Sequence, residues 1–268
     1  MGTIGRKTAY VVLAGLLATM VPNFRPVHAE LPFLTDEAET LGKGTRQVEL
    51  WYARSTDEET AAGSVVTTDQ HLPGATFGYG VTEMLDLTFG FSRLWGKVTA
   101  DGSSSNDAGS GVSSLSAKWR LYENTGFHFS VKPLVGYSYR VGGPGDEHTV
   151  SCGGWLIATG EHEALEVSLN AGFLHNDYGS ASERDATRSG IWNFSALAEY
   201  KALPVLKLGL DVGAFTNPDK ASGEMQVYAL PGMVYSPTGD VDLSLGFKFG
   251  VTRPEQDFAG TAGLTLRF

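Results

Sequence analysis

Cysteine is nearly absent from this sequence. Its 268 residues hold one cysteine, Cys152, which excludes an internal disulfide framework. Cys152 lies in an alternating apolar stretch, where we expect a small buried or lipid-facing side chain. Histidines such as His71 and His148 are scattered without the spacing of zinc ligands, so the sequence predicts no metal site.

Long hydrophobic runs are also missing after residue 29. No apolar run there approaches the roughly 20 residues that a membrane-spanning helix needs. Helical periodicity is hard to find, whereas apolar and polar residues alternate along most of the chain. The pattern therefore favours an all-β protein.

Residues 1–29 form a segment of their own. Arg6 and Lys7 are followed by an apolar run over 8–21, and small residues at Val27 and Ala29 precede Glu30. This arrangement predicts a secretory signal peptide that is cleaved after Ala29, with an amino-terminal anchor helix as the alternative.

Positive charge is scarce in the remaining chain. Residues 1–29 hold three basic and no acidic side chains, so their removal leaves 239 residues and changes the net charge from −10 to −13. Such acidity argues against nucleic acid as a partner.

The alternating segments predict twelve strands with connections of two kinds. Five short connections alternate with six long polar ones, which lie at 56–66, 98–111, 142–149, 177–189, 217–223 and 252–257. The predicted strands are 44–55, 67–81, 84–97, 112–122, 126–142, 150–160, 164–176, 190–202, 205–216, 224–236, 241–251 and 258–268.

These connections are typical of one fold class, the transmembrane antiparallel up-and-down β-barrel, here with about 12 strands. Such a barrel has short periplasmic turns, long extracellular loops and both termini in the periplasm. A soluble exported sandwich or barrel is the alternative. Predicted strands of about 11 to 15 residues suit a tilted span better than the usual soluble strand of about 5 or 6.

The last stretch, residues 258–268, supports this fold class. Phe258, Leu264 and Phe268 share one apolar face, and Thr261 and Thr265 share the other. A barrel in lipid needs its last strand to pair with its first. The pattern also resembles the strand that outer-membrane barrels present for assembly, so we expect the barrel-assembly machinery to bind through Phe268.

Aromatic residues gather near the predicted strand ends, as in the two girdles of a membrane barrel. The loop-side girdle is predicted to hold Trp51, Tyr52, Trp95, Tyr137 and Tyr139. The turn-side girdle is predicted to hold Tyr79, Trp119, Tyr122, Tyr200, Tyr235 and Phe268.

Charged residues fall on the opposite face of the strands, which is predicted to face the lumen. Such charges either line a wet pore or pair across a closed one. Residues 30–43 are predicted to be a plug or a periplasmic extension before a barrel of 44–268. The predicted pore-lining residues are Asp86, Lys118, Arg120, Lys132, Arg140, Glu199, Asp211 and Lys248.

One pair of residues has the side-chain types of a catalytic site. His128 and Ser130 stand two apart on one strand face, as in lipid-hydrolysing barrels, but they lie on the turn side and lack the surrounding motif. The sequence predicts two polar lumen residues there, no catalytic residue and no cofactor.

The chain after residue 29 opens with Pro32, Thr35, Asp36 and a Gly-Lys-Gly at 42–44. With this opening, the sequence resembles the outer-membrane meta-pathway phenol-degradation transporter family, although residue 37 is glutamate where the family often has aspartate. Weaker matches lie at 78–87, 115–120, 231–237 and 264–268.

The resemblance implies uptake of aromatic compounds. We therefore expect an outer-membrane channel for passive passage of small apolar or aromatic molecules. Its partners would be membrane lipid, lipopolysaccharide and the small-molecule substrate. The alternatives are a structural or adhesive barrel with a closed lumen and a lipid-modifying enzyme.

Overall fold

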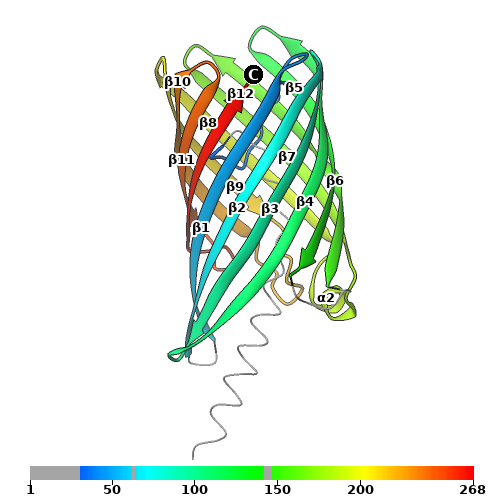
Figure 1. Ribbon diagram of the computed structural model, residues 1–268, viewed down its shortest axis with the longest axis vertical. Helices are drawn as coiled ribbons and strands as arrows, with labels where there is room; N and C mark the ends of the chain where they lie inside the picture. Colours follow the sequence, from blue (N-terminus) through cyan, green and yellow to red (C-terminus); the bar gives the residue numbers. More distant parts are fainter. Residues whose placement is uncertain (1–30, 62–63, 142–146) are drawn as a thin grey trace, which may run out of the picture.

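The computed structural model describes residues 31–61, 64–141 and 147–268. The predicted signal peptide, residues 1–29, lies outside these ranges. The described residues form twelve antiparallel strands in a closed barrel, so the predicted fold class is confirmed (Figure 1). The strands are β1 (Arg46–Ala61), β2 (Ser64–Thr82), β3 (Leu85–Ala100), β4 (Ser103–Asn124), β5 (Phe127–Arg140), β6 (His148–His162), β7 (Leu165–Tyr178), β8 (Gly190–Leu203), β9 (Leu206–Phe215), β10 (Gln226–Thr238), β11 (Val241–Gly250) and β12 (Phe258–Arg267).

Closure of the barrel depends on the pairing of β1 with β12. The register runs from Gln47 opposite Arg267 to Thr56 opposite Phe258. At its end, the backbone N–H groups of Arg46 and Phe268 each donate to the other residue's carbonyl, at 2.9 and 3.0 Å. Because every strand then has two neighbours, no edge is left with unpaired backbone groups.

The two ends of the barrel differ. At the short-turn end, each of five turns leaves two residues between its strands, and the carboxyl terminus lies there too, at the top of Figure 1. At the opposite, long-loop end, most connections are longer. Among the described residues, no helix is long and apolar enough to span a membrane.

The side chains have the polarity of a membrane barrel. On β11, Leu243 and Phe247 point outward and are 47% and 42% exposed, whereas Ser244 and Lys248, each the next residue along, are buried inside. On the other strands, too, the outward residues are mostly apolar, while the inner face carries most of the polar residues together with some apolar ones such as Leu134 and Ile157. The outer surface is therefore suited to lipid rather than to water.

The residues predicted for the aromatic girdles face outward, with one exception. Trp51 is buried inside the barrel, so its predicted place in the loop-side girdle is wrong. Its neighbour Tyr52 faces outward, and adjacent residues on a strand point to opposite faces, so only one of the two can reach lipid. The Trp51 indole lies over Gly74 of β2, where a Cβ atom would come within 2.1 Å of the ring.

Two of the predicted long loops are mostly strand. Segments 56–66 and 98–111 belong largely to β1, β2, β3 and β4, which pair almost to their tips and project beyond the neighbouring loops (Figure 1). The prediction was wrong because these segments lack an apolar face. A strand that has left the membrane no longer needs one, and its serine, threonine and valine residues pair well in β-structure.

The loop between β7 and β8 contains a short helix that the sequence analysis did not predict, α2 (Ala181–Ala186). This loop contacts the loop between β9 and β10. Arg188 donates to the carbonyl of Asn217 at 2.7 Å, and Thr187 pairs with Asp219 in an isolated bridge. The two loops therefore form one connected rim at the long-loop end.

The topology gives a testable prediction. In a Cys152→Ser background, a cysteine at Ser103 should react with a membrane-impermeant maleimide on intact cells, because Ser103 begins β4 at the long-loop end. A cysteine at Thr125, in the turn before β5, should react only after the outer membrane is permeabilised. Labelling of Thr125→Cys but not Ser103→Cys on intact cells would show that the barrel has the opposite orientation in the membrane.

Candidate functional site in the barrel lumen

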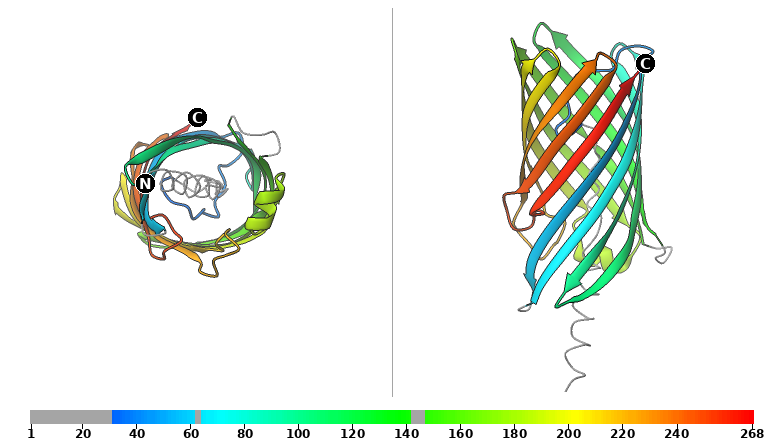
Figure 2. Two further views of the ribbon diagram at one scale, coloured as in Figure 1. Left: turned by 90° about the horizontal axis from the view of Figure 1, so that it is seen from below. Right: turned by 60° about the vertical axis from the view of Figure 1, so that its left-hand side comes forward.

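The lumen holds the chain that precedes β1. This luminal segment, residues 31–45, runs as irregular chain inside the ring of strands. The left view of Figure 2 looks along the barrel and shows the segment within the ring. Leu31, Phe33 and Ala38 are 2%, 0% and 0% exposed. The segment is thus packed into the barrel rather than extended away from it.

Followed backwards from β1, the luminal segment makes a circuit of the inner wall. It first contacts β2 and β3, then β4, β5 and β6, then β9, and finally β10, β11 and β12. Contacts with nearly all strands mean that the segment's position depends on the whole ring.

Asp36 is the charged centre of this circuit. Its carboxylate lies between Lys118 of β4, whose Nζ donates to Oδ1 at 3.0 Å, and Lys132 of β5, whose Nζ donates to Oδ2. Burial by itself raises the pKa of the Asp36 carboxyl, but the two lysines outweigh it and leave the pKa below its ordinary value. Asp36 is therefore a buried carboxylate that stays ionised because two cations pair with it.

A second carboxylate, Asp211 of β9, binds the luminal segment from the opposite wall. Its Oδ2 accepts hydrogen bonds from the backbone N–H groups of Leu34 and Thr35 at 2.6 and 2.8 Å. Its Oδ1 accepts from the Thr35 hydroxyl at 2.7 Å and from the Tyr228 hydroxyl at 3.0 Å. Four donors compensate for the cost of burying Asp211, which is 0% exposed.

Polar side chains of the wall also satisfy the backbone around Ala38. Its N–H donates to Thr159 Oγ1 at 2.8 Å, and its carbonyl accepts from the Ser130 hydroxyl. Asn170, with its amide oriented to suit both bonds, accepts from the N–H of Asp36 at 2.6 Å and donates to its carbonyl at 2.9 Å. These side chains replace the pairing that a neighbouring strand would give to buried backbone.

The far end of the luminal segment is apolar. Phe33 is fully buried in a cluster on the inner wall of β8, β9 and β10 that comprises Leu197, Phe215, Tyr228, Leu230 and Val234. Gly209 and Gly232 make room for the ring, because a Cβ atom at either position would lie 2.3 and 2.8 Å from its carbons. An aromatic ring thus fits an apolar hollow in a lumen wall that elsewhere carries buried charged residues as well as other apolar ones.

The near end of the luminal segment crosses the rim at two glycines, Gly42 and Gly44. Both have positive φ, at 81° and 86°, which favours glycine. The Gly42 carbonyl lies so close to Gly80 of β2 that a Cβ atom there would be 1.8 Å from its oxygen. Beside this crossing, the Leu41 N–H donates to Asp86 Oδ2 at 2.8 Å, which fixes where the chain turns inward.

Two groups of side chains near the short-turn end bring possible metal ligands together. Glu39, His128 and Glu161 form one group, and Glu37, Glu39 and Glu166 form the other. Burial raises the pKa of the Glu39 carboxyl, which belongs to both groups. The sequence analysis missed these groups because their members come from separate segments.

A second segment contacts the inner wall toward the long-loop end. The connection of residues 251–257 places Glu255 inside the barrel, where its Oε1 is 2.6 Å from Lys248 Nζ. Beside this pair, Gln256 Nε2 donates to Gln70 Oε1 of β2 at 2.6 Å. The connection therefore bonds to the inner wall on both β11 and β2.

The predicted pore-lining residues all occupy inner-face positions. Arg120 and Arg140 lie near opposite ends of the barrel, where Arg120 donates to the Glu83 carbonyl at 2.8 Å and Arg140 pairs with Asp107 at 3.3 Å. The other predicted residues are buried or form ion pairs within the lumen: Asp86, Lys118, Lys132, Glu199, Asp211 and Lys248. That these residues line a conducting path stays a prediction.

Two residues of the luminal segment that contact the wall, Asp36 and Phe33, were not predicted as site residues from the sequence. A signal was present for Asp36, because it begins an acidic run in a segment placed before strands whose inner faces are basic. Nothing comparable marked Phe33, since a single phenylalanine in an irregular segment carries no periodicity.

His128 and Ser130 face the lumen, but they do not form a catalytic pair. The Ser130 hydroxyl donates to the Ala38 carbonyl, while His128 Nε2 faces Glu39 and Glu161 at 3.5 and 3.6 Å. Each side chain therefore contacts the luminal segment or its surroundings, whereas a nucleophilic serine needs a histidine within hydrogen-bond reach.

A closed antiparallel ring, an apolar outer belt with aromatic girdles and a polar lumen define a transmembrane β-barrel of the outer-membrane class. A family model described as "Putative MetA-pathway of phenol degradation" matches residues 35–268. The chain belongs to this family. A search of curated protein sequences found no match.

Solved structures with the same fold include barrels of several kinds. An outer membrane channel from Pseudomonas putida F1 has a TM-score of 0.63 and 15% identity, over 86% of this chain and 98% of that one. The translocator domain of the autotransporter NalP from Neisseria meningitidis has a TM-score of 0.54 and 13% identity, over 98% of both chains. The KdgM porin has a TM-score of 0.52 and 10% identity, over 83% of this chain and 99% of that one.

The charged centre gives a testable prediction. Asp36→Asn should loosen the luminal segment, because it leaves Lys118 and Lys132 buried without their carboxylate. The free energy for opening the segment should fall by about 3 kcal/mol. Hydrogen exchange of residues 34–38 in the purified barrel should therefore speed up by two orders of magnitude or so, at roughly 1.4 kcal/mol per tenfold.

The matched control is Asp185→Asn. It makes the same chemical change on the exposed helix α2 and should leave exchange in the luminal segment unaltered. Equal exchange in the Asp36→Asn variant and the wild type would show that the lysines do not hold the segment.

Proposed function

We propose that this protein is a passive outer-membrane channel for small apolar or aromatic molecules, with the luminal segment as its constriction. The observation that carries the proposal is the apolar hollow that Phe33 occupies. The chain's own aromatic ring occupies an apolar hollow of the lumen wall, and a small aromatic molecule has the same shape and chemistry. The family description, which names phenol degradation, agrees with this substrate class.

The constriction is held without covalent bonds. The described contacts between the luminal segment and the wall are hydrogen bonds, ion pairs and apolar packing, and Gly42 and Gly44 join the segment to β1. A segment of this kind can leave the wall without breaking the barrel, because the strands pair independently of it. Passage then requires the segment to move or to leave space beside it.

The same network supports the alternative of a structural barrel with a closed lumen. Asp36, Asp211 and Phe33 are each satisfied or packed, which would stabilise a permanently filled interior. The two functions differ in the wild-type protein, which conducts if the lumen is a passage and does not conduct if it is permanently closed.

Deleting residues 31–41 should open the lumen. In planar bilayers the wild type should show small conductance, and the deletion variant should show a conductance several times larger, because a buried segment no longer crosses the pore. Circular dichroism and heat-modifiable mobility would confirm that the barrel still forms. A folded deletion variant with unchanged conductance would contradict the constriction.

Phe33→Ala should create a site for a free aromatic molecule. Loss of the ring leaves an apolar cavity, and the change should cost about 3–5 kcal/mol locally. Phenol or toluene should bind in its place, as apolar cavities bind benzene, and should raise the thermal midpoint of the variant more than that of the wild type.

Phe77→Ala is the control for this experiment. Phe77 is an outward-facing aromatic residue of β2, so its loss should produce no response to phenol or toluene beyond that of the wild type. An equal response of all three proteins would show that the hollow under Phe33 does not accept aromatic molecules.

A further inference from the structure

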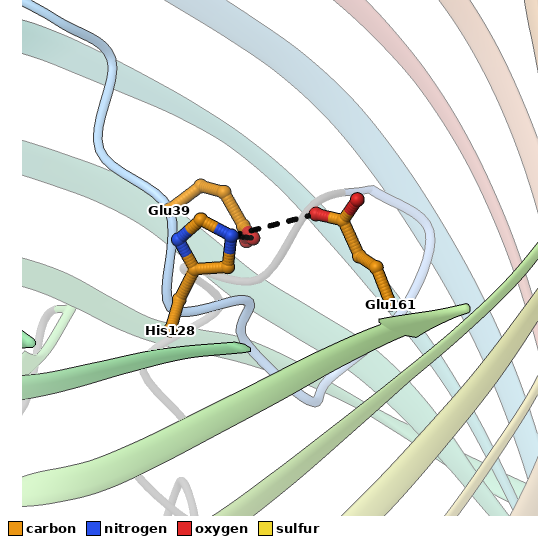
Figure 3. A group of neighbouring side chains, drawn as sticks. All are labelled: Glu39, His128 and Glu161. Carbon is orange, nitrogen blue, oxygen red and sulfur yellow. Dashed lines mark ion pairs between the residues drawn. The ribbon is translucent and has the colours of Figure 1, made fainter. Parts of the chain in front are cut away.

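Three metal-ligating side chains meet near the short-turn end of the lumen (Figure 3). Glu39 belongs to the luminal segment, His128 to the start of β5 and Glu161 to the end of β6. Their candidate ligand atoms all lie within 4.8 Å of one another. The fold therefore gathers residues that are far apart in the sequence, and one of them belongs to the constriction.

The distances fit a shared ion better than hydrogen bonds. His128 Nε2 is 3.5 Å from Glu39 Oε1 and 3.6 Å from Glu161 Oε1. Both exceed the usual hydrogen-bond length of roughly 2.7–3.2 Å, and a single ring N–H can point at only one oxygen. A tetrahedral ion about 2.1 Å from each ligand holds its ligands about 3.4 Å apart.

The carboxylate of Glu39 supplies a second, independent observation. Both of its oxygens are buried, and neither accepts a hydrogen bond from another of the described residues. Ligand oxygens of Glu37 and Glu166 also lie within 4.8 Å of it. A buried carboxylate among others is stabilised by a cation. Lys207 Nζ lies 3.9 Å from Glu37 Oε1, whereas the side chain that faces Glu39 and Glu161 together is His128.

The ligand types restrict the ion. One imidazole nitrogen with carboxylate oxygens suits Zn²⁺ and its transition-metal neighbours, whereas Ca²⁺ and Mg²⁺ take oxygen ligands. The Glu161 side chain is 48% exposed, so the group is open to solvent. An ion can thus enter, and water can complete its coordination.

We propose that Glu39, His128 and Glu161 bind a divalent transition metal ion such as Zn²⁺, and that the ion ties the luminal segment to β5 and β6. The bound metal is a removable cross-link between the constriction and the wall. This proposal concerns binding and local order, so it does not rest on the protein being a channel.

Metal binding can be measured directly. Full-length mature protein in detergent, stripped with chelator, is titrated with Zn²⁺ by calorimetry. We expect one ion per chain. His128→Ala and Glu161→Gln should each weaken binding by more than the roughly 10- to 100-fold that loss of an outer-shell partner costs.

Two variants at the same end of the barrel are matched controls. His162→Ala and Glu163→Gln remove the same chemical groups from exposed positions next to Glu161, and both should bind Zn²⁺ like the wild type. Glu161→Gln also tests the site if His128→Ala fails to fold, because Glu161 is the second-last residue of β6 and is half exposed. Absence of binding in the wild type, or equal binding in all five proteins, would overturn the site.

The cross-link has its own readout. Zn²⁺ should slow hydrogen exchange of residues 38–41 in the wild type by about tenfold or more and should leave it unchanged in His128→Ala and Glu161→Gln. Zn²⁺ that binds through these residues without slowing the exchange would retain the site but overturn the tie to the luminal segment.

Discussion

The constraint on which the whole structure depends is that backbone N–H and C=O groups cannot be left unpaired in hydrocarbon. The pairing of β1 with β12 satisfies it, since the ring then has no free edge. Closure also sets the polarity of every strand, because alternate residues must face lipid and lumen. The charges at Asp86, Asp211 and Lys248 lie inside because a charged side chain on the lipid-facing surface would be destabilising.

The interior then has the opposite problem, which is how to stabilise buried charge. This barrel solves it by bringing its own amino-terminal chain into the lumen. Asp36 pairs with two wall lysines, and Asp211 in return binds the backbone of the same segment. The wall and the luminal segment are therefore complementary in charge, as two partners in a complex are.

Much of the fold could be predicted from the sequence, because a period of two and a pattern of turns are local properties. The twelve strands and the inward position of Lys132 or Glu199 follow from alternation alone. Trp51 shows the limit of assigning a girdle from aromatic residues near a strand end: alternation with Glu49 and Leu50 places Trp51 inside, where it lies over Gly74.

The candidate site was less predictable, because it depends on contacts between distant segments. The Phe33 hollow and the group around His128 require knowledge of where residues 31–45 run inside the ring. No spacing along the chain contains that information. The polar tips of β1 to β4 were missed for a related reason: sequence shows where an apolar face stops, but pairing continues beyond it.

The glycines along the path of the luminal segment have a consequence for how this family can vary. Gly209, Gly232, Gly246 and Gly263 lie on four different strands, and a Cβ atom at each would meet Phe33, Pro32 or Leu31. They form a groove whose depth is matched to those side chains. Substitutions in the groove and in residues 31–33 must therefore be compensated together, so two relatives with different segments cannot exchange their barrels freely.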